Sequence, residues 1–232
     1  MRLYFLLAGI MAIATVLNGD NTQRAKNDRI NSLPGITFQT TFEQYSGYLS
    51  GGGNRKIHYW LIKSQKSPDQ DPLLLWFNGG PGCSSLIGTF TECGPFRVNR
   101  DNATLWENVY TWNKFTNMLF IEMPAGVGYS YNTDNYYNTG DYDARDQTYS
   151  ALLDFLNNVF PEYKTRDMYI SGESYCGVYL PMLAARIVDG IQSGKFPNNL
   201  KGVAIGNGIM SERLQTNSVL DFMYFHGVIG KE

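Results

Sequence analysis

Apolar residues divide the first half of the chain into strand-like segments. Residues 42–49 and 56–62 alternate apolar and polar side chains on either side of a glycine triplet at 51–53, which indicates a β-hairpin with a long loop. Residues 73–77 and 117–122 are short, almost wholly apolar runs. Such runs are typical of strands buried on both faces of a parallel sheet.

The second half alternates helix-like and strand-like segments. Residues 142–160 place leucines and a valine on one helical face until Pro161 ends the pattern. A strand is predicted at 167–171, a helix at 175–191 and a further strand at 201–205. The order strand, helix, strand, helix, strand predicts an α/β fold with a mostly parallel sheet.

The amino terminus has the pattern of a targeting segment. After Arg2 comes an uncharged apolar run, Leu3–Leu17, which is shorter than the roughly 20 residues of a membrane span. This predicts a secretory signal peptide over residues 1–19, with cleavage after either Ala14 or Gly19. We expect a loose polar leader over 20–33 and one domain from residue 34 to residue 232. The protein should then be exported or delivered to the lumen of the endomembrane system.

Composition excludes several functions. The 232 residues include 19 Lys+Arg and 21 Asp+Glu, with no basic run, which argues against nucleic-acid binding. Three cysteines and two histidines are too few and too scattered for a zinc cluster. We therefore expect no metal and no cofactor.

Two glycine-rich turns carry candidate chemistry. The first, residues 172–177, reads G-x-S-x-G around Ser174 and lies between a predicted strand and a predicted helix, where a nucleophilic serine can be presented on a sharp turn. The second follows the strand at 73–77 and contains Asn78, Gly79 and Gly80. A Gly-Gly turn at a strand end can direct backbone N–H groups toward a developing oxyanion.

Five segments, in order, closely resemble the serine carboxypeptidases of the cathepsin A type. The resemblance runs from about Leu33 to the last residue and implies an α/β-hydrolase fold, with a mostly parallel central sheet and helices on both faces. The fold is expected to be incomplete here, ending near the start of a helical cap. The segments are LWFNGGPGCSS (75–85), FTECGPF (90–96), NMLFIEMPAGVGYSY (117–131), SGESYCGVYLP (171–181) and GVAIGNG (202–208).

The resemblance implies a role for each matching residue. It makes Ser174 the nucleophile of a carboxypeptidase that releases C-terminal amino acids through an acyl-enzyme. It assigns the oxyanion hole to the backbone N–H groups of Gly80 and Tyr175. Peptide or protein C-termini are the implied substrates, and a homodimer is compatible with the family. The implied location is an acidic lumen, as of a lysosome or vacuole, or the cell exterior. The implied binding site for the substrate carboxylate comprises Asn78, Gly79, Glu92 and Glu173.

The two glutamates suggest a pH dependence. Two carboxylates at close range do not both ionise readily, so they share a proton and one pKa rises. A protonated Glu92 or Glu173 can donate a hydrogen bond to a substrate carboxylate, whereas an ionised one repels it. We therefore expect peptide binding to be strongest at acidic pH.

The acid–base half of a catalytic triad is not evident. A hydrolase of this fold orders its triad Ser, Asp, His. His58 precedes Ser174, and His226, Asp189 and Asp221 lie too soon after it in the predicted topology. The sequence thus resembles the N-terminal part of a serine carboxypeptidase, with little activity expected of it alone and an apolar sheet edge exposed. The alternatives are a non-catalytic secreted fragment and acyltransferase or esterase chemistry on the same scaffold.

Cysteines and a glycosylation motif complete the candidate sites. In the family, the cysteine of Gly-Pro-Gly-Cys pairs with a later one, so Cys83 is expected to be unpaired here. Cys93 and Cys176 either form a disulfide or are buried free thiols. Asn102, in Asn-Ala-Thr, is the predicted glycosylation site.

Overall fold

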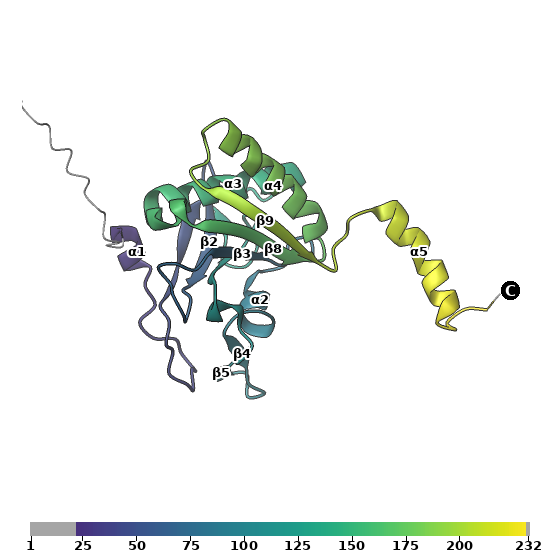
Figure 1. Cartoon of the computed structure of the whole chain (residues 1–232), viewed down its shortest axis with the longest axis horizontal. Coiled ribbons are helices and arrows are strands. Elements are labelled where there is room, and N and C mark those ends of the chain that lie inside the picture. Colours follow the sequence, from purple (N-terminus) through teal and green to yellow (C-terminus); the bar gives the residue numbers. More distant parts are fainter. Residues whose placement is uncertain (1–21, 231–232) are drawn as a thin grey trace, which may run out of the picture.

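The computed structural model describes residues 22–230 and shows one central sheet with helices on its faces (Figure 1). The strand order is β1-β2-β6-β3-β8-β9, with β7 paired to β2. Strands β6, β3, β8 and β9 run parallel, and β1-β2-β6 are antiparallel. The sheet strands are β1 (Gln44–Ser50), β2 (Arg55–Ile62), β3 (Leu73–Phe77), β6 (Asn117–Ile121), β7 (Tyr131–Asn132), β8 (Asp167–Glu173) and β9 (Asn199–Gly206).

Helices and a small second sheet cover the two faces. Every residue of β6 is buried, as its apolar sequence requires. One face packs against α3 and α4, and the other against α2, the β4-β5 pair and part of the segment before β1. This arrangement confirms the predicted α/β-hydrolase-like fold. The covering elements are α2 (Leu86–Thr91), β4 (Phe96–Val98), β5 (Leu105–Glu107), α3 (Asp141–Asp154) and α4 (Cys176–Gln192).

The helix expected over 142–160 changes its winding before its end. The α-helical part of α3 stops at Asp154, and Phe155–Val159 forms one π-helical turn that buries Phe155, Leu156 and Val159. Pro161 then opens a 3-10 turn, Pro161–Thr165. Its ring cannot continue the helical hydrogen bonding, so the proline acts as the predicted stop.

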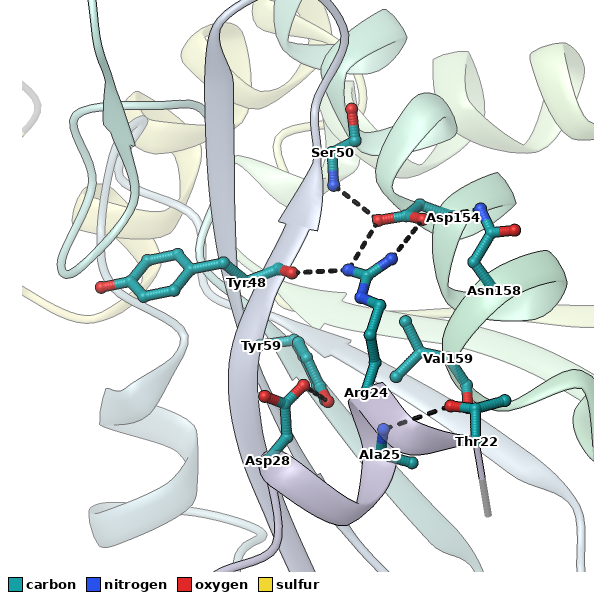
Figure 2. Close-up of polar contacts among 10 residues, drawn as sticks. All are labelled: Thr22, Arg24, Ala25, Asp28, Tyr48, Ser50, Tyr59, Asp154, Asn158 and Val159. Carbon is teal, nitrogen blue, oxygen red and sulfur yellow. Dashed lines mark hydrogen bonds and ion pairs between the residues drawn. The ribbon is translucent and has the colours of Figure 1, made fainter. Parts of the chain in front are cut away.

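The segment expected to be a loose leader is docked on the domain over its described residues. Thr22 caps α1 (Gln23–Asn27) through the Ala25 N–H and donates to the Val159 carbonyl at 2.7 Å. Ala25 is fully buried. As Figure 2 shows, the Arg24 guanidinium contacts both carboxylate oxygens of Asp154, at 2.8 and 3.0 Å, and the Tyr48 carbonyl. The predicted signal peptide lies outside the described residues.

The β9 side of the sheet is apolar and open, as expected. Strand β9 is the last in the order, and no strand of residues 22–230 pairs with its outer edge. Val203 on β9 is exposed, and α5 (Glu212–Phe225), which Figure 1 shows apart from the sheet, buries none of its residues. Among residues 22–230 no helix has both the length and the hydropathy needed to cross a bilayer.

The docked helix predicts an acid-sensitive contribution to stability. Burial opposes ionisation of Asp154, but the hydrogen bond from Arg24, with those from Asn158 and the Ser50 N–H, outweighs it and lowers the pKa below 3.8. Arg24→Met should therefore reduce the free energy of unfolding at pH 7 by about 1–2 kcal/mol, measured by urea denaturation.

The pH dependence of the stability lost in Arg24→Met tests the role of the Asp154 carboxylate more directly. A carboxyl whose pKa is lower in the folded state stabilises the fold at pH values above its unfolded-state pKa. This contribution is lost as the pH falls through the folded-state pKa. The difference between wild type and Arg24→Met should thus shrink below about pH 4. Arg145→Met, which removes a surface pair with Asp146, should cost less than about 0.5 kcal/mol. Equal losses in the two variants would contradict the anchoring role of Arg24.

Candidate active site

Ser174 lies on a sharp turn between β8 and α4. Its φ is 59°, in the left-handed region that side chains other than glycine seldom adopt. Backbone hydrogen bonds hold this conformation: the Ser174 N–H donates to the Gly206 carbonyl at 3.0 Å, and the Ser174 carbonyl accepts from Ile209 at 2.9 Å. The pairing of β8 with β9 therefore supports the strained position of the candidate nucleophile.

The glycine turn after β3 packs directly on this elbow. A Cβ added to Gly79 would collide with the Tyr175 backbone nitrogen and lie 2.7 Å from the Glu173 carbonyl oxygen. Only a glycine allows the two backbones to approach so closely. Within residues 22–230 the backbone N–H groups of Gly80 and Tyr175 have no hydrogen-bond acceptor. Two free N–H donors thus belong to adjoining segments beside Ser174.

The Asn78 side chain joins the two candidate glutamates. Its Nδ2 donates to both oxygens of Glu92, at 3.1 and 3.2 Å, and to Glu173 Oε1 at 3.1 Å. Its Oδ1 accepts from the indole N–H of Trp76 and from the Gly88 N–H. Because both ends of the amide are occupied, its orientation is fixed and the two carboxylates are held on one nitrogen.

Glu92 is electrostatically unusual. Burial raises its pKa above the ordinary value of 4.5, and the neighbouring charge of Glu173 raises it further, while the hydrogen bond from Asn78 acts in the opposite direction. Both carboxylates are half-buried. A protonated carboxyl beside an ionised one provides a hydrogen-bond donor for a bound carboxylate.

The sequence-predicted residues are thus largely gathered in one place. Asn78, Glu92 and Glu173 are hydrogen bonded together, and Gly79 packs on Tyr175. Asn102 lies elsewhere, exposed in the turn between β4 and β5 with a φ of 56°. An exposed turn is compatible with the predicted glycosylation, which stays a prediction.

Neither histidine contacts the candidate nucleophile. His58 is buried on β2, between Glu122 and Ser46. His226 is exposed at the end of α5, stacked on the Phe222 ring at 3.9 Å. The carboxylates considered for a triad, Asp189 on α4 and Asp221 on α5, are also exposed.

The three cysteines are free thiols. Cys93 and Cys176 are both buried and do not form the disulfide that was one alternative. Burial raises the pKa of Cys176 to about 12, so this thiol stays protonated at neutral pH. Its Sγ donates to the Phe77 carbonyl, which places it under the elbow as a packing residue.

The sequence did not reveal a pocket of about 380 Å³ beside the glycine turn. Pro81, Gly82, Tyr179 and Asp141 contribute to its lining. The Tyr175 hydroxyl donates to the Asp141 carboxylate at 3.2 Å, which connects the pocket to the residue after Ser174. No motif marks Asp141, whose only sequence signal is its position at the start of a helix.

Comparison with known proteins gives consistent matches. The family model described as serine carboxypeptidase matches residues 34–232. The chain is 50% identical over 202 residues to the serine carboxypeptidase ctsa-4.1 of Caenorhabditis elegans, covering 87% of this chain and 42% of the relative. It is 45% identical over 210 residues to the lysosomal protective protein of Mus musculus, covering 90% and 43%.

A solved structure agrees with this match. Kex1, a prohormone-processing carboxypeptidase from Saccharomyces cerevisiae, superimposes with a TM-score of 0.79 at 28% identity. The superposition covers 90% of this chain and 48% of Kex1. The chain therefore spans less than half the length of these three proteins.

The close contact at Gly79 predicts a sensitive position. Gly79→Ala should lower the free energy of unfolding by about 1–3 kcal/mol, because the added methyl group meets backbone atoms that cannot move without displacing the elbow. Gly140→Ala is the matched control, since a Cβ there has no neighbour within 4 Å and should change stability by less than about 0.5 kcal/mol. Equal urea midpoints for the two variants would contradict this packing.

Proposed function

Because the chain belongs to the serine carboxypeptidase family, we propose that it recognises the free C-terminal carboxylate of peptides, with Ser174 placed to attack the last peptide bond. The observation that carries the proposal is the hydrogen bonding of Asn78 to both Glu92 and Glu173 beside the elbow. A carboxylate ligand needs donors, and an amide with a protonated carboxyl supplies them.

The proposed binding mode uses the turn after β3 as a platform. The substrate carboxylate meets the Asn78–Glu92–Glu173 cluster and the backbone of Gly79. The scissile carbonyl then reaches Ser174, and its oxygen faces the N–H groups of Gly80 and Tyr175, which have no other acceptor within residues 22–230. Two such donors stabilise the charge that develops on that oxygen during attack.

Proton transfer limits the proposed chemistry. Attack forms a bond between Ser174 Oγ and the carbonyl carbon, and the hydroxyl proton must leave for a base. Both histidines have other partners, so neither is hydrogen bonded to Ser174. Serine hydrolases without their triad keep a residual acceleration of about 10³–10⁴ over water through oxyanion stabilisation and binding. We therefore propose that this stretch of chain binds C-termini and, taken alone, hydrolyses them slowly.

The proposed setting is an acidic lumen of the secretory pathway or the cell exterior. One relative is named a lysosomal protein. The raised pKa of Glu92 suits such a compartment, because the protonated form binds a carboxylate.

A first test compares a peptide acid with its amide. At about pH 5 a tripeptide with a free carboxylate should bind at least tenfold more tightly than the same peptide with a C-terminal amide. Only the acid has a carboxylate whose two oxygens can accept from the Asn78 amide and from protonated Glu92. Isothermal titration calorimetry gives the two affinities.

The variant Asn78→Ala should abolish that preference. Asn54→Ala, which removes a surface amide bonded to Asp134, should preserve it. Circular dichroism verifies that both variants are folded. Equal affinities of the wild-type chain for acid and amide would overturn the proposed carboxylate site.

The second test concerns the proton on Glu92. Binding of the peptide acid should weaken as pH rises through the raised pKa of Glu92, because Glu92 then loses its proton and the cluster repels the ligand. Glu92→Gln keeps a donor that does not ionise, so its affinity should stay nearly constant. Glu107→Gln, at an exposed position of β5, should retain the wild-type profile. An unchanged profile in Glu92→Gln would show that the proton lies elsewhere.

A further inference from the structure

A serine hydroxyl, an imidazole and a carboxylate form a chain of hydrogen bonds near the β1 edge of the sheet, which is the edge opposite β9. The Ser46 hydroxyl on β1 is 2.8 Å from His58 Nε2 on β2. His58 Nδ1 is 2.9 Å from Glu122 Oε2, at the end of β6. The His58 and Glu122 side chains are only 8% and 1% exposed. These distances are the ones that join a nucleophile, its base and the group that orients the base.

The contacts of Glu122 fix the direction of the hydrogen bonds. Burial opposes its ionisation, but hydrogen bonds from His58, Ser84 and the Tyr129 N–H outweigh that effect and lower its pKa. An ionised carboxylate only accepts, so Nδ1 of a neutral His58 carries the ring proton. In this neutral tautomer Nε2 has a lone pair that can accept from the Ser46 hydroxyl, 2.8 Å away. This is the tautomer that a general base requires.

The loop after β6 closes over the carboxylate. Gly128, at a φ of 53°, packs on Glu122 so closely that a Cβ would overlap Oε1. The Ser130 hydroxyl donates to the backbone carbonyl of Glu122 at 2.6 Å and accepts from the backbone N–H of His58 at 2.7 Å. The imidazole and its carboxylate are therefore rigid relative to each other.

Ser46 is accessible from an open pocket of about 280 Å³. The pocket is lined by Ser46, Tyr48, His58, Trp60, Leu86 and Tyr129. Two rings flank the imidazole edge-on, Tyr129 at 5.4 Å and Tyr48 at 5.7 Å between centroids. An aromatic pocket above a buried base suits an apolar or aryl group.

We propose that Ser46, His58 and Glu122 form a second nucleophilic site, separate from Ser174, that accepts an acyl group from an activated ester. Ser46 Oγ attacks the carbonyl carbon while its proton moves to His58 Nε2. The bond from that carbon to the aryloxy oxygen breaks, and the leaving aryloxide takes the proton from His58. The products are O-acyl-Ser46 and a free phenol.

The backbone restricts the substrate class. The Ser46 N–H already donates to the Asp28 carbonyl at 2.8 Å, so it is not available for an oxyanion. Each missing oxyanion donor costs about 10²–10³ in rate. Amides need that stabilisation and should not react, whereas an ester with a good leaving group needs less of it. The site should therefore acylate quickly with aryl esters and lose the acyl group slowly.

The test uses p-nitrophenyl acetate on the full chain carrying Ser174→Ala, which removes the elbow hydroxyl. We expect about one equivalent of p-nitrophenolate as a burst. One acetyl group should appear in the tryptic peptide of residues 30–55, localised to Ser46 by fragmentation. Adding Ser46→Ala should abolish both signals, and Ser50→Ala, on the same strand, should leave both unchanged. Acetylation spread over lysines or other hydroxyls, with none at Ser46, would overturn the proposal.

A second pair of measurements distinguishes activation of the Ser46 hydroxyl by His58 from simple solvent exposure of that hydroxyl. His58→Gln in the same background should slow acetylation of Ser46 at least 100-fold, in line with the usual contribution of a general base. Acetylation of Ser46 in urea-unfolded protein should be equally slow, and this measurement does not depend on the folding of the His58 variant. Labelling of unfolded and folded protein at the same rate would show that the imidazole does not activate Ser46.

Discussion

The side-chain amide of Asn78 is the contact on which the geometry of the candidate site depends. It lies immediately after β3, accepts from Trp76 and from the start of α2, and donates to Glu92 after α2 and to Glu173 at the end of β8. Three elements thus meet on the two polar atoms of one side chain. Two carboxylates would otherwise repel each other there, and the shared donor together with a raised pKa on Glu92 makes their proximity tolerable.

The parallel order of the sheet supplies the frame for that contact. Strands β3 and β8 are neighbours, so their carboxyl ends place the glycine turn beside the elbow. Ligand-binding crevices of open α/β sheets arise at this end of the strands for the same reason. The strained φ of Ser174 is then held from the next strand, through the carbonyl of Gly206. The Asn78–Glu92–Glu173 cluster and the position of Ser174 consequently depend on the same three strands.

The sequence predicted this part of the molecule well because it is encoded locally. Apolar runs identified β3 and β6, and the two glycine turns identified the backbones that pack together. Three features escaped prediction because they depend on contacts between distant segments. Arg24 binds Asp154, which lies 130 positions later in the chain, so the segment predicted as a loose leader contains a helix docked on the domain. Asp141 borders a pocket only through the placement of α3, and the π-helical turn at Phe155–Val159 reflects core packing rather than a local signal.

His58 illustrates the same limit with a chemical consequence. Its position before Ser174 argued against a role in the elbow's triad, and its contacts agree, since its two ring nitrogens face Glu122 and Ser46. The sequence could not indicate that β1 would supply a hydroxyl to His58, because this contact follows from the hairpin register. The register pairs Tyr48 with His58 and places Ser46 two pairs away, on the same face of the sheet.

Ser174 and Ser46 therefore each lack one catalytic component that the other has. Ser174 adjoins free N–H donors but no imidazole among the described residues, and Ser46 has an oriented imidazole but a backbone N–H already in use. A general base contributes about 10²–10⁴ in rate and each oxyanion donor about 10²–10³. Fast hydrolysis of an amide requires both contributions on one hydroxyl, because its leaving group is poor and its tetrahedral intermediate is costly. Separation of the two contributions on different strands is thus consistent with the two proposals, in which the elbow binds peptide C-termini and the hairpin reacts with activated esters.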